Sequence, residues 1–215
     1  MHPFLDLRDI KENFMANIIS ISRIFLIFIA VGLLYFKEST AAYVASLILT
    51  IIAFSFDGLD GYVARKFNET SKLGAVLDIM GDRITEYVFW IMLAHMGWIP
   101  VIFPIIVVAR GVVTDSLRSV ALEQGFIPFG KGSMLEDKVC QWICGSKVMK
   151  ISYAVAKAIA FTFYIIAYTP GMNPIAACVV LIIGALAAEL SILLCVLRGI
   201  PVLFESKKFF VKEAK

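Results

Sequence analysis

Polar and charged side chains are scarce in this sequence. Asp, Glu, Lys and Arg together make up 17% of the 215 residues, whereas hydrophobic residues make up 60% and the mean hydropathy is +0.86. An ordinary soluble domain carries about a quarter of its residues as charges, so this composition excludes that class. The length is that of one domain. We therefore expect a single-domain protein that lies in a lipid bilayer.

Histidine and cysteine are also rare, with two and four residues respectively. The cysteines lie in apolar or helix-like segments, so no disulfide framework is implied. Cys140 and Cys144 are spaced i, i+4 and could in principle share a metal ion. No histidine accompanies them, however, and cysteine is commonly a small buried hydrophobe. We expect neither a metal site at these cysteines nor a nucleic-acid partner.

Long apolar segments predict an all-α membrane protein with six transmembrane helices and an N-terminal amphipathic surface helix over residues 3–14. No cleavable signal is evident, because charges such as Asp6 and Arg8 precede a first segment that is long enough to span. Pro104 is expected to interrupt the fourth span. The expected spans are residues 18–36, 41–64, 74–94, 100–117, 147–168 and 174–197. The predicted organisation is an amphipathic segment over 1–16, a six-helix domain over 17–198 and a basic tail over 199–215.

The distribution of basic residues predicts the orientation of these spans. The connections 37–42, 95–100 and 168–174 together hold one Lys or Arg, whereas the N-terminal segment, the 65–73 turn, residues 118–150 and the tail hold fifteen. Because basic residues stay on the cytoplasmic side, we expect both termini in the cytoplasm. The predicted localisation is the cytoplasmic membrane, with membrane lipids around the spans.

Four aspartates lie within or at the ends of two apolar segments, where an unpaired charge costs at least ~3 kcal/mol. Asp57 and Asp60 share one face of the second span, and Asp78 and Asp82 share one face of the third. Antiparallel packing about the turn would bring all four carboxylates together. Oxygen ligands without His or Cys suit hard cations such as Mg2+, Mn2+ or Ca2+, and four are enough for two ions. Such a binuclear site is suited to displacement at phosphorus.

Two plainer interpretations remain for parts of this pattern. A single Asp near a helix end is commonly a cap or a solvated charge, although four on facing stripes favour a site. The small residues nearby, such as Gly58 and Gly74, also allow close packing of membrane helices. Both roles are compatible, because close packing would bring the carboxylates within reach of one metal pair.

The aspartates belong to a longer pattern that fixes eight residues over twenty-six positions. This pattern resembles the signature of the CDP-alcohol phosphotransferases, membrane enzymes of phospholipid synthesis. The resemblance implies that all four aspartates bind two divalent ions, Mg2+ or Mn2+, at the CDP pyrophosphate, and that the fourth also acts as the catalytic base. The eight residues are Asp57, Asp60, Gly61, Ala64, Arg65, Gly74, Asp78 and Asp82.

The same resemblance implies a CDP pocket lined by Gly61, Ala64, Arg65 and Gly74, with Arg65 offsetting phosphate charge. Residues 17–23 resemble a degenerate form of the family's Pro-Asn-x-x-Thr-x-x-Arg opening, with Ala16 and Ser20 in place of Pro and Thr. We therefore interpret Asn17 as a nucleotide contact, against the alternative of a helix cap. Arg23 is expected either to extend to lipid phosphate or to face the site.

The acceptor alcohol is not named by the aspartates. Five cations near the fourth and fifth spans favour an acceptor that carries its own phosphate, although some of them are expected to contact lipid headgroups. Residues 110–121 resemble the corresponding stretch of phosphatidylglycerophosphate synthases, and residues 145–150 loosely resemble their Gly-Lys-x-Lys motif. These resemblances imply glycerol 3-phosphate, with inositol 1-phosphate as the alternative. The five cations are Arg110, Arg118, Lys131, Lys147 and Lys150.

The predicted reaction transfers the phosphatidyl or archaetidyl group of CDP-diacylglycerol or CDP-archaeol to this acceptor and releases CMP. A homodimer is implied by the resemblance alone. The rival class is a divalent-cation transporter, although no internal repeat of the kind common in transporters is evident. Two further pairs are predicted from spacing or depth, Arg83 with Glu86 and Lys157 with Glu189.

Overall fold

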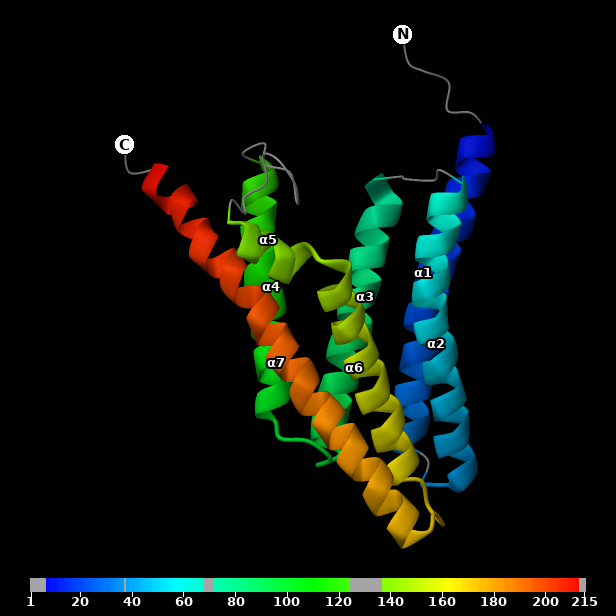
Figure 1. The fold of residues 1–215 in the computed structure, drawn as a ribbon. Helices are drawn as coiled ribbons and strands as arrows, with labels where there is room; N and C mark the ends of the chain where they lie inside the picture. The colour runs from blue at the N-terminus through cyan, green and yellow to red at the C-terminus, as the bar shows by residue number, and fades with distance from the viewer. Residues whose placement is uncertain (1–6, 37, 68–71, 124–136, 213–215) are drawn as a thin grey trace. The chain divides into compact units, whose positions relative to one another are not determined.

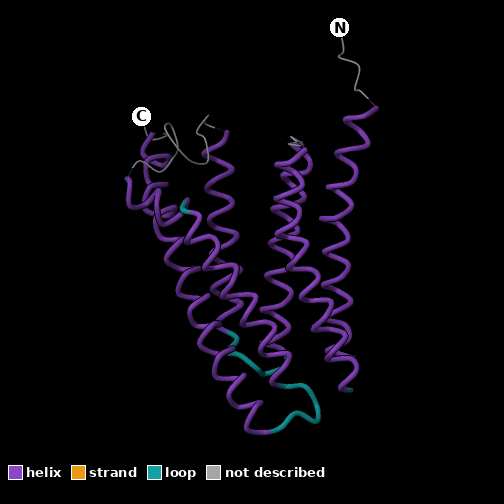
Figure 2. The backbone as a smooth tube through the Cα atoms, turned by 45° about the vertical axis from the view of Figure 1, so that its right-hand side comes forward, coloured by secondary structure: helices purple, strands orange, loops and turns teal. Residues whose placement is uncertain are grey.

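The computed structural model describes residues 7–36, 38–67, 72–123 and 137–212, which form helices joined by short loops (Figure 2). In part of these helices, including the positions of Asp57, Asp60 and Asp78, only the backbone is described. Within the described ranges there are seven helices and no strand (Figure 1). They are α1 Leu7–Phe36, α2 Thr40–Phe67, α3 Lys72–His95, α4 Ile102–Glu123, α5 Lys138–Gly145, α6 Lys147–Ala167 and α7 Pro174–Lys212. The all-α prediction is confirmed for this part of the chain.

The loops contain the residue types that such turns require. Gly97, with φ of 72°, lies between α3 and α4, and Gly171, with φ of 84°, lies between α6 and α7. Glycine adopts this left-handed conformation without the steric cost of a Cβ. The Asn173 Oδ1 atom accepts hydrogen bonds from the backbone N–H groups of Ile175 at 2.9 Å and Ala176 at 3.5 Å. This cap satisfies two donors at the start of α7.

Three helices differ from the sequence-based expectation. Over the described residues, α1 is one continuous helix, so no break separates a surface helix from the first span. Pro104 does not interrupt α4 but lies in its first turn, where a missing N–H removes no helical hydrogen bond. Helix α7 continues through Pro201 to Lys212. The buried Val202 just after this proline shows that packing supports the extension.

The chain forms two compact units, of which unit 1 comprises Met1–Leu93 and Thr162–Val180. Helix α1 packs against α2, and its residues Ile27, Ala30 and Leu34 are buried at spacings of three and four, as expected for one helical face. The rings of Phe54 on α2 and Phe89 on α3 stack with centroids 6.0 Å apart. Aromatic packing of this kind positions α3, which carries Asp82, against α2.

Unit 2 comprises Ala94–Phe161 and Leu181–Lys215. Its small apolar cluster joins Ala121 of α4, Cys144 of α5 and Val202 of α7. The short helix α5 is attached to α7 at both ends. At its start the Asp137 backbone N–H donates to Glu205 Oε1 at 3.2 Å, and near its end the Cys144 thiol donates to the Arg198 carbonyl at 3.3 Å.

Two helical stretches of the described chain are long and apolar enough to cross a membrane, Lys147–Ala167 and Pro174–Ser206. The second stretch exposes large aliphatic side chains along its length, including Ile175, Ile182 and Leu186 at 77%, 55% and 62%. Exposed apolar faces of this extent indicate contact with lipid or protein in place of water. The structure is therefore that of an all-helical protein with membrane-type helices.

Candidate active site

The predicted aspartates are divided between two consecutive helices of unit 1. Asp57 lies ten residues before the end of α2 and Asp82 ten residues after the start of α3, while Asp60 and Asp78 lie seven and six residues from the same ends. Helix α2 ends and α3 begins at the same end of this unit (Figure 1). Because these residue counts are nearly equal, the backbone of Asp57 lies at about the level of Asp82 along the two helices, and the backbone of Asp60 at about the level of Asp78. The convergence of the four carboxylates stays a prediction, because three of these side chains lie outside the described set.

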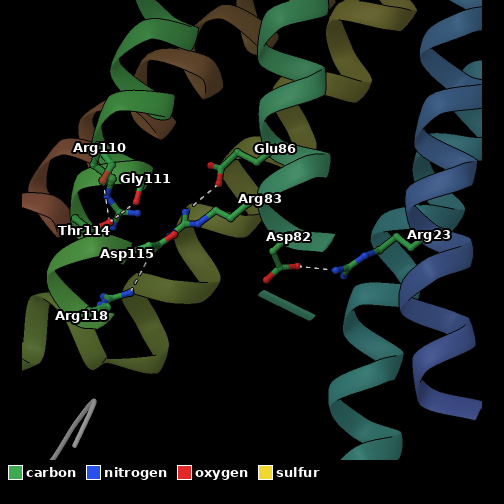
Figure 3. A network of polar contacts seen from close by, with 9 residues as sticks. All are labelled: Arg23, Asp82, Arg83, Glu86, Arg110, Gly111, Thr114, Asp115 and Arg118. Carbon is green, nitrogen blue, oxygen red and sulfur yellow. Dashed lines mark hydrogen bonds and ion pairs between the residues drawn. The ribbon is translucent and has the colours of Figure 1, made fainter. Parts of the chain in front are cut away.

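Asp82 is the aspartate whose side chain is described, and its partner comes from α1. Arg23 Nη2 lies 2.9 Å from Asp82 Oδ1, with the Arg23 side chain 2% exposed and the Asp82 side chain 51% exposed (Figure 3). Of the two predicted roles for Arg23, its burial and its contact with Asp82 favour facing the predicted site over extending to lipid phosphate. The Asp82 carboxylate is half exposed even though it is paired with this buried guanidinium.

The second charge pair on α3 follows within one turn of Asp82. Arg83 Nη1 lies 3.5 Å from Glu86 Oε2, and the Glu86 side chain is 3% exposed. This i, i+3 pair is the one that the sequence predicts. Because Glu86 is buried, its charge needs such a partner, and the pair occupies Arg83 beside the candidate base.

A group of cations lies in unit 2, and we call it the cation group: Arg110 and Arg118 of α4, Lys150 of α6 and Arg198 of α7. Lys150 is within electrostatic range of Arg198 and Arg118, and Arg198 is within range of Arg110 and Arg118. The buried Nε atoms of Arg110 and Arg198 have no hydrogen-bond partner among the described residues. Converging positive charge with unused donors is suited to an anion.

Close helix packing brings this group together. A Cβ placed on Gly199 of α7 would lie 2.9 Å from Arg110 Cγ, so the missing side chain makes room for Arg110. The Arg198 guanidinium carbon lies 5.5 Å from the centroid of the Tyr153 ring on α6, within cation–π range. The Arg118 guanidinium lies 3.9 Å from the Asp115 carboxylate. The group thus combines four cationic side chains with this acidic neighbour.

The structure describes the predicted acceptor residues unequally. It brings Arg110, Arg118 and Lys150 into one group, while Lys147 is exposed at the start of α6 and no described contact joins it to them. Lys131 lies outside the described residues. Arg198 was not among the predicted acceptor residues, because it lies at the boundary between the last expected span and the basic tail. In the structure α7 continues past this boundary to Lys212 and so holds Arg198 within a helix.

The predicted CDP-pocket residues lie where only the backbone is described. Asn17 is on α1, while Gly61, Ala64 and Arg65 are on α2 and Gly74 is on α3. All belong to unit 1, as does Asp82. Their contacts with a nucleotide stay predictions.

The cysteines of α5 are held as neutral thiols. Burial, followed by a hydrogen bond to Asp137 and the charge of Glu205, raises the pKa of Cys140 to about 11. Burial also raises the pKa of Cys144, although the guanidinium groups of Arg118, Arg198 and Arg110 act in the opposite direction. A thiol must ionise to bind a metal, so these shifts disfavour metal binding at this pair.

The sequence model for CDP-alcohol phosphatidyltransferases matches residues 13–196. This match covers most of the chain and includes all four aspartates. The chain belongs to the CDP-alcohol phosphatidyltransferase family. Family membership supports the inference from the aspartate pattern, while Arg198 and the end of α7 lie beyond the matched range.

Curated relatives of the family include enzymes named for two different acceptors. A CDP-diacylglycerol–glycerol-3-phosphate 3-phosphatidyltransferase of Haemophilus influenzae is 31% identical over 110 residues, which are 50% of this chain and 58% of that enzyme. The enzyme of the same name from Rickettsia typhi is 28% identical over 145 residues, 65% of this chain and 81% of that enzyme. A probable CDP-diacylglycerol–inositol 3-phosphatidyltransferase of Arabidopsis thaliana is 30% identical over 83 residues, 39% of this chain and 35% of that protein.

The residues of the α2–α3 pair fit the divalent ions that the family pattern implies. All four candidate ligands are carboxylates, the donor type that hard cations such as Mg2+ and Mn2+ prefer. The described geometry adds that the Asp82 carboxylate is half exposed and uses Oδ1 toward Arg23. The contact with Arg23 thus engages one of the two carboxylate oxygens of Asp82.

Proposed function

We propose that this chain is a membrane phosphotransferase that transfers the phosphatidyl group of CDP-diacylglycerol to glycerol 3-phosphate and releases CMP. The observation that carries the reaction class is the family match over residues 13–196, which contains the four aspartates. The observation that favours a phosphorylated acceptor is the cation group in unit 2. Both features come from residues that are costly to bury in a membrane protein without a ligand.

The aspartates would hold two Mg2+ or Mn2+ ions, which offset the charge of the CDP pyrophosphate. Asp82 accepts the proton of the acceptor hydroxyl, whose oxygen attacks the lipid-side phosphorus. The bond from that phosphorus to the bridging oxygen breaks, and CMP leaves with the bonding electrons. Positioning of the substrates and general-base action both increase the reaction rate, and the base alone accounts for an increase of about 10²- to 10⁴-fold. The nucleotide pocket in this proposal is formed by Asn17, Gly61, Ala64, Arg65 and Gly74.

The cation group would bind the phosphate of glycerol 3-phosphate. Arginine supplies paired N–H donors that match phosphate oxygens, and two of the arginines have buried Nε atoms without a described acceptor. Arg110, Arg118, Lys150 and Arg198 are the residues proposed for this contact. Lys131 and Lys147 remain additional candidates from the sequence.

The second candidate acceptor is inositol 1-phosphate. Relatives named for inositol transfer support it, and its phosphate would use the same cations. Glycerol 3-phosphate is preferred, because relatives named for that acceptor match longer stretches of this chain. Serine and choline are disfavoured, since neither carries a phosphate.

The proposal extends to the membrane arrangement. We propose six transmembrane helices in the cytoplasmic membrane, with both termini and the aspartates on the cytoplasmic side. The lipid chains of CDP-diacylglycerol, or of CDP-archaeol, would remain in the bilayer. A homodimer is proposed from the family resemblance, and light scattering of the purified protein in detergent tests it.

The test uses purified protein in detergent with CDP-diacylglycerol and Mn2+, measuring CMP release. Parallel reactions contain glycerol 3-phosphate, inositol 1-phosphate, serine or no acceptor. Release that depends on glycerol 3-phosphate supports the whole proposal, and release with inositol 1-phosphate alone replaces the acceptor. Absence of CMP with every acceptor from folded protein, and with CDP-archaeol as donor, contradicts the reaction class.

The variant Asp82→Asn tests the assignment of the base. It keeps the size of the side chain but removes its ability to accept a proton, so CMP release should fall by about 10²-fold or more while the protein stays folded. Circular dichroism and the melting temperature check the fold. Near-normal turnover in this variant would show that another group is the base.

A further inference from the structure

Arg23 occupies an unusual position for a charged residue of an apolar helix. It lies on α1, sixteen residues into a helix that begins at Leu7, and its side chain is 2% exposed. A buried guanidinium is costly unless it is paired, and Arg23 forms an ion pair with Asp82 at 2.9 Å. Figure 3 shows the guanidinium extending from α1 toward the carboxylate on α3.

The neighbour of Asp82 provides the space for this contact. A Cβ added to Gly81 would lie 2.7 Å from Arg23 Nη2, closer than a real Cβ contact allows, and 3.6 Å from Arg23 Cζ. Gly81 is itself buried. The end of the Arg23 side chain therefore lies where any side chain at position 81 would be. Arg23 and Gly81 form a fitted pair beside Asp82, although the sequence separates them by more than fifty residues.

The difference in exposure between Arg23 and Asp82 indicates which of the two side chains orients the other. The Arg23 side chain is buried at 2% exposure, whereas the Asp82 side chain is 51% exposed, so the contact constrains the more exposed of the two partners. The bond to Nη2 uses Oδ1 and so limits the rotation of the carboxylate about its side-chain bonds. Oδ2 is then held in one place. A charge-assisted hydrogen bond of this length provides both strength and orientation.

We propose that Arg23 is a positioning residue that orients the Asp82 carboxylate through Oδ1, and that Gly81 is required because it leaves room for the guanidinium. The proposal rests on the proposed function, in which Asp82 is a metal ligand and the base. Arg23 does not touch substrate in this proposal. Its effect reaches the reaction through Asp82 alone.

The first test is Gly81→Ala, which should displace the flexible end of Arg23 without removing any charge. Alanine favours a helix more than glycine does, which offsets part of the cost of displacing the buried guanidinium, so the protein should still fold. We expect kcat to fall about 10-fold, with the KM for CDP-diacylglycerol changed less than about 2-fold, because small misplacements of a reacting group are costly. Gly32→Ala on α1 is the matched control, since its added Cβ would meet nothing within 4 Å.

The second test compares Arg23→Gln with Arg23→Lys. Glutamine removes the charge and should lower kcat about 10- to 100-fold, whereas lysine keeps a donor near Asp82 and should restore part of the loss. A role in helix packing alone would instead lower the melting temperature and the yield of both variants. It would not change kcat per folded molecule.

The third test does not depend on turnover. Mn2+ binding without substrate is measured by the electron paramagnetic resonance signal of free Mn2+, for Arg23→Gln in the Asp82 and the Asp82→Asn backgrounds. We expect the arginine substitution to change the apparent Kd about 3-fold or more when Asp82 is present. In the Asp82→Asn background, Arg23→Gln should not change the apparent Kd further, because the carboxylate through which Arg23 acts is already absent.

These outcomes separate the two proposals. Wild-type protein that binds Mn2+ but releases no CMP contradicts the proposed function, while the binding cycle still decides the role of Arg23. Active wild-type protein with Gly81→Ala and Arg23→Gln indistinguishable from Gly32→Ala overturns the positioning role. Equal effects of Arg23→Gln on Mn2+ binding in both backgrounds overturn it as well. If Arg23→Gln does not fold, Gly81→Ala decides alone.

Discussion

At the scale of single residues, the two charge pairs of α3 each have one buried partner. Arg23 is 2% exposed beside a half-exposed Asp82, and Glu86 is 3% exposed beside a partly exposed Arg83. Removing one partner of such a pair leaves an uncompensated buried charge, which costs more than the pair contributes. The predicted Lys157–Glu189 pair is absent from the described structure, where Lys157 Nζ instead lies 4.5 Å from the centroid of the Tyr153 ring.

The raised pKa of Cys140 predicts low reactivity. With a pKa of about 11, this thiol is almost wholly protonated at pH 8, and since the thiolate is the reactive form, alkylation should be about 100-fold slower than for an ordinary cysteine. The rate should rise as the pH approaches 11. Iodoacetamide labelling followed by mass spectrometry, in protein whose other cysteines are replaced, measures it.

The control for this labelling is the same protein unfolded in detergent and urea. Unfolding removes both the burial and the nearby carboxylates, so the rate should return to that of a free thiol. Equal rates in folded and unfolded protein would contradict the pKa shift and its cause.

At the scale of helices, close approach in unit 2 depends on a glycine. Gly199 allows α7 to lie against the Arg110 side chain of α4, and the cation group needs α4, α6 and α7 together. Helix α5 reinforces this arrangement, because Glu205 of α7 accepts a hydrogen bond from the residue before α5. Small residues allow membrane helices to pack closely. Here the close packing also brings the charged side chains of the cation group together.

The variant Gly199→Ala should therefore weaken binding of the acceptor. Its Cβ would lie 2.9 Å from Arg110 Cγ, so the arginine must shift within the cation group. We expect the KM for glycerol 3-phosphate to rise about 5- to 10-fold, as for loss of part of a charge-assisted contact, while the KM for CDP-diacylglycerol stays within 2-fold. Gly32→Ala again serves as the control. An unchanged KM for glycerol 3-phosphate in Gly199→Ala would show that Arg110 does not contribute to acceptor binding.

At the scale of the whole molecule, apolar side chains cover helical surfaces that a soluble protein would make polar. Ile175, Val179, Ile182 and Leu186 follow one another along α7 at exposures between 53% and 77%. The spacing of three and four residues puts them on one helical face. Lipid chains satisfy such a face without cost, whereas water does not.

We predict that the protein stays with the membrane pellet after extraction with alkaline carbonate and is released only by detergent. Alkaline carbonate removes proteins held by charge, but it does not remove helices that span the apolar core of the bilayer. Immunoblotting of pellet and supernatant measures the result. Recovery of most of the protein in the carbonate supernatant would contradict the membrane assignment.

Much of this protein could be predicted from local patterns in its sequence. The helical segments from residue 41 onward and the Arg83–Glu86 pair depend on neighbouring residues, so periodicity and spacing suffice to predict them. The aspartate pattern likewise identified the family. The break expected in the N-terminal part of α1 and the C-terminal end of α7 were predicted wrongly, because packing, and not composition, decides whether a helix continues.

Only the tertiary structure decided which distant residues meet. The contact of Arg23 with Asp82, the room that Gly81 leaves for it and the addition of Arg198 to the cation group join helices far apart in the chain. No periodicity encodes such contacts, since they depend on how the helices pack and on which buried charge needs a partner. The sequence determined the kind of chemistry, and the packing of the helices decided which charged residues can serve it.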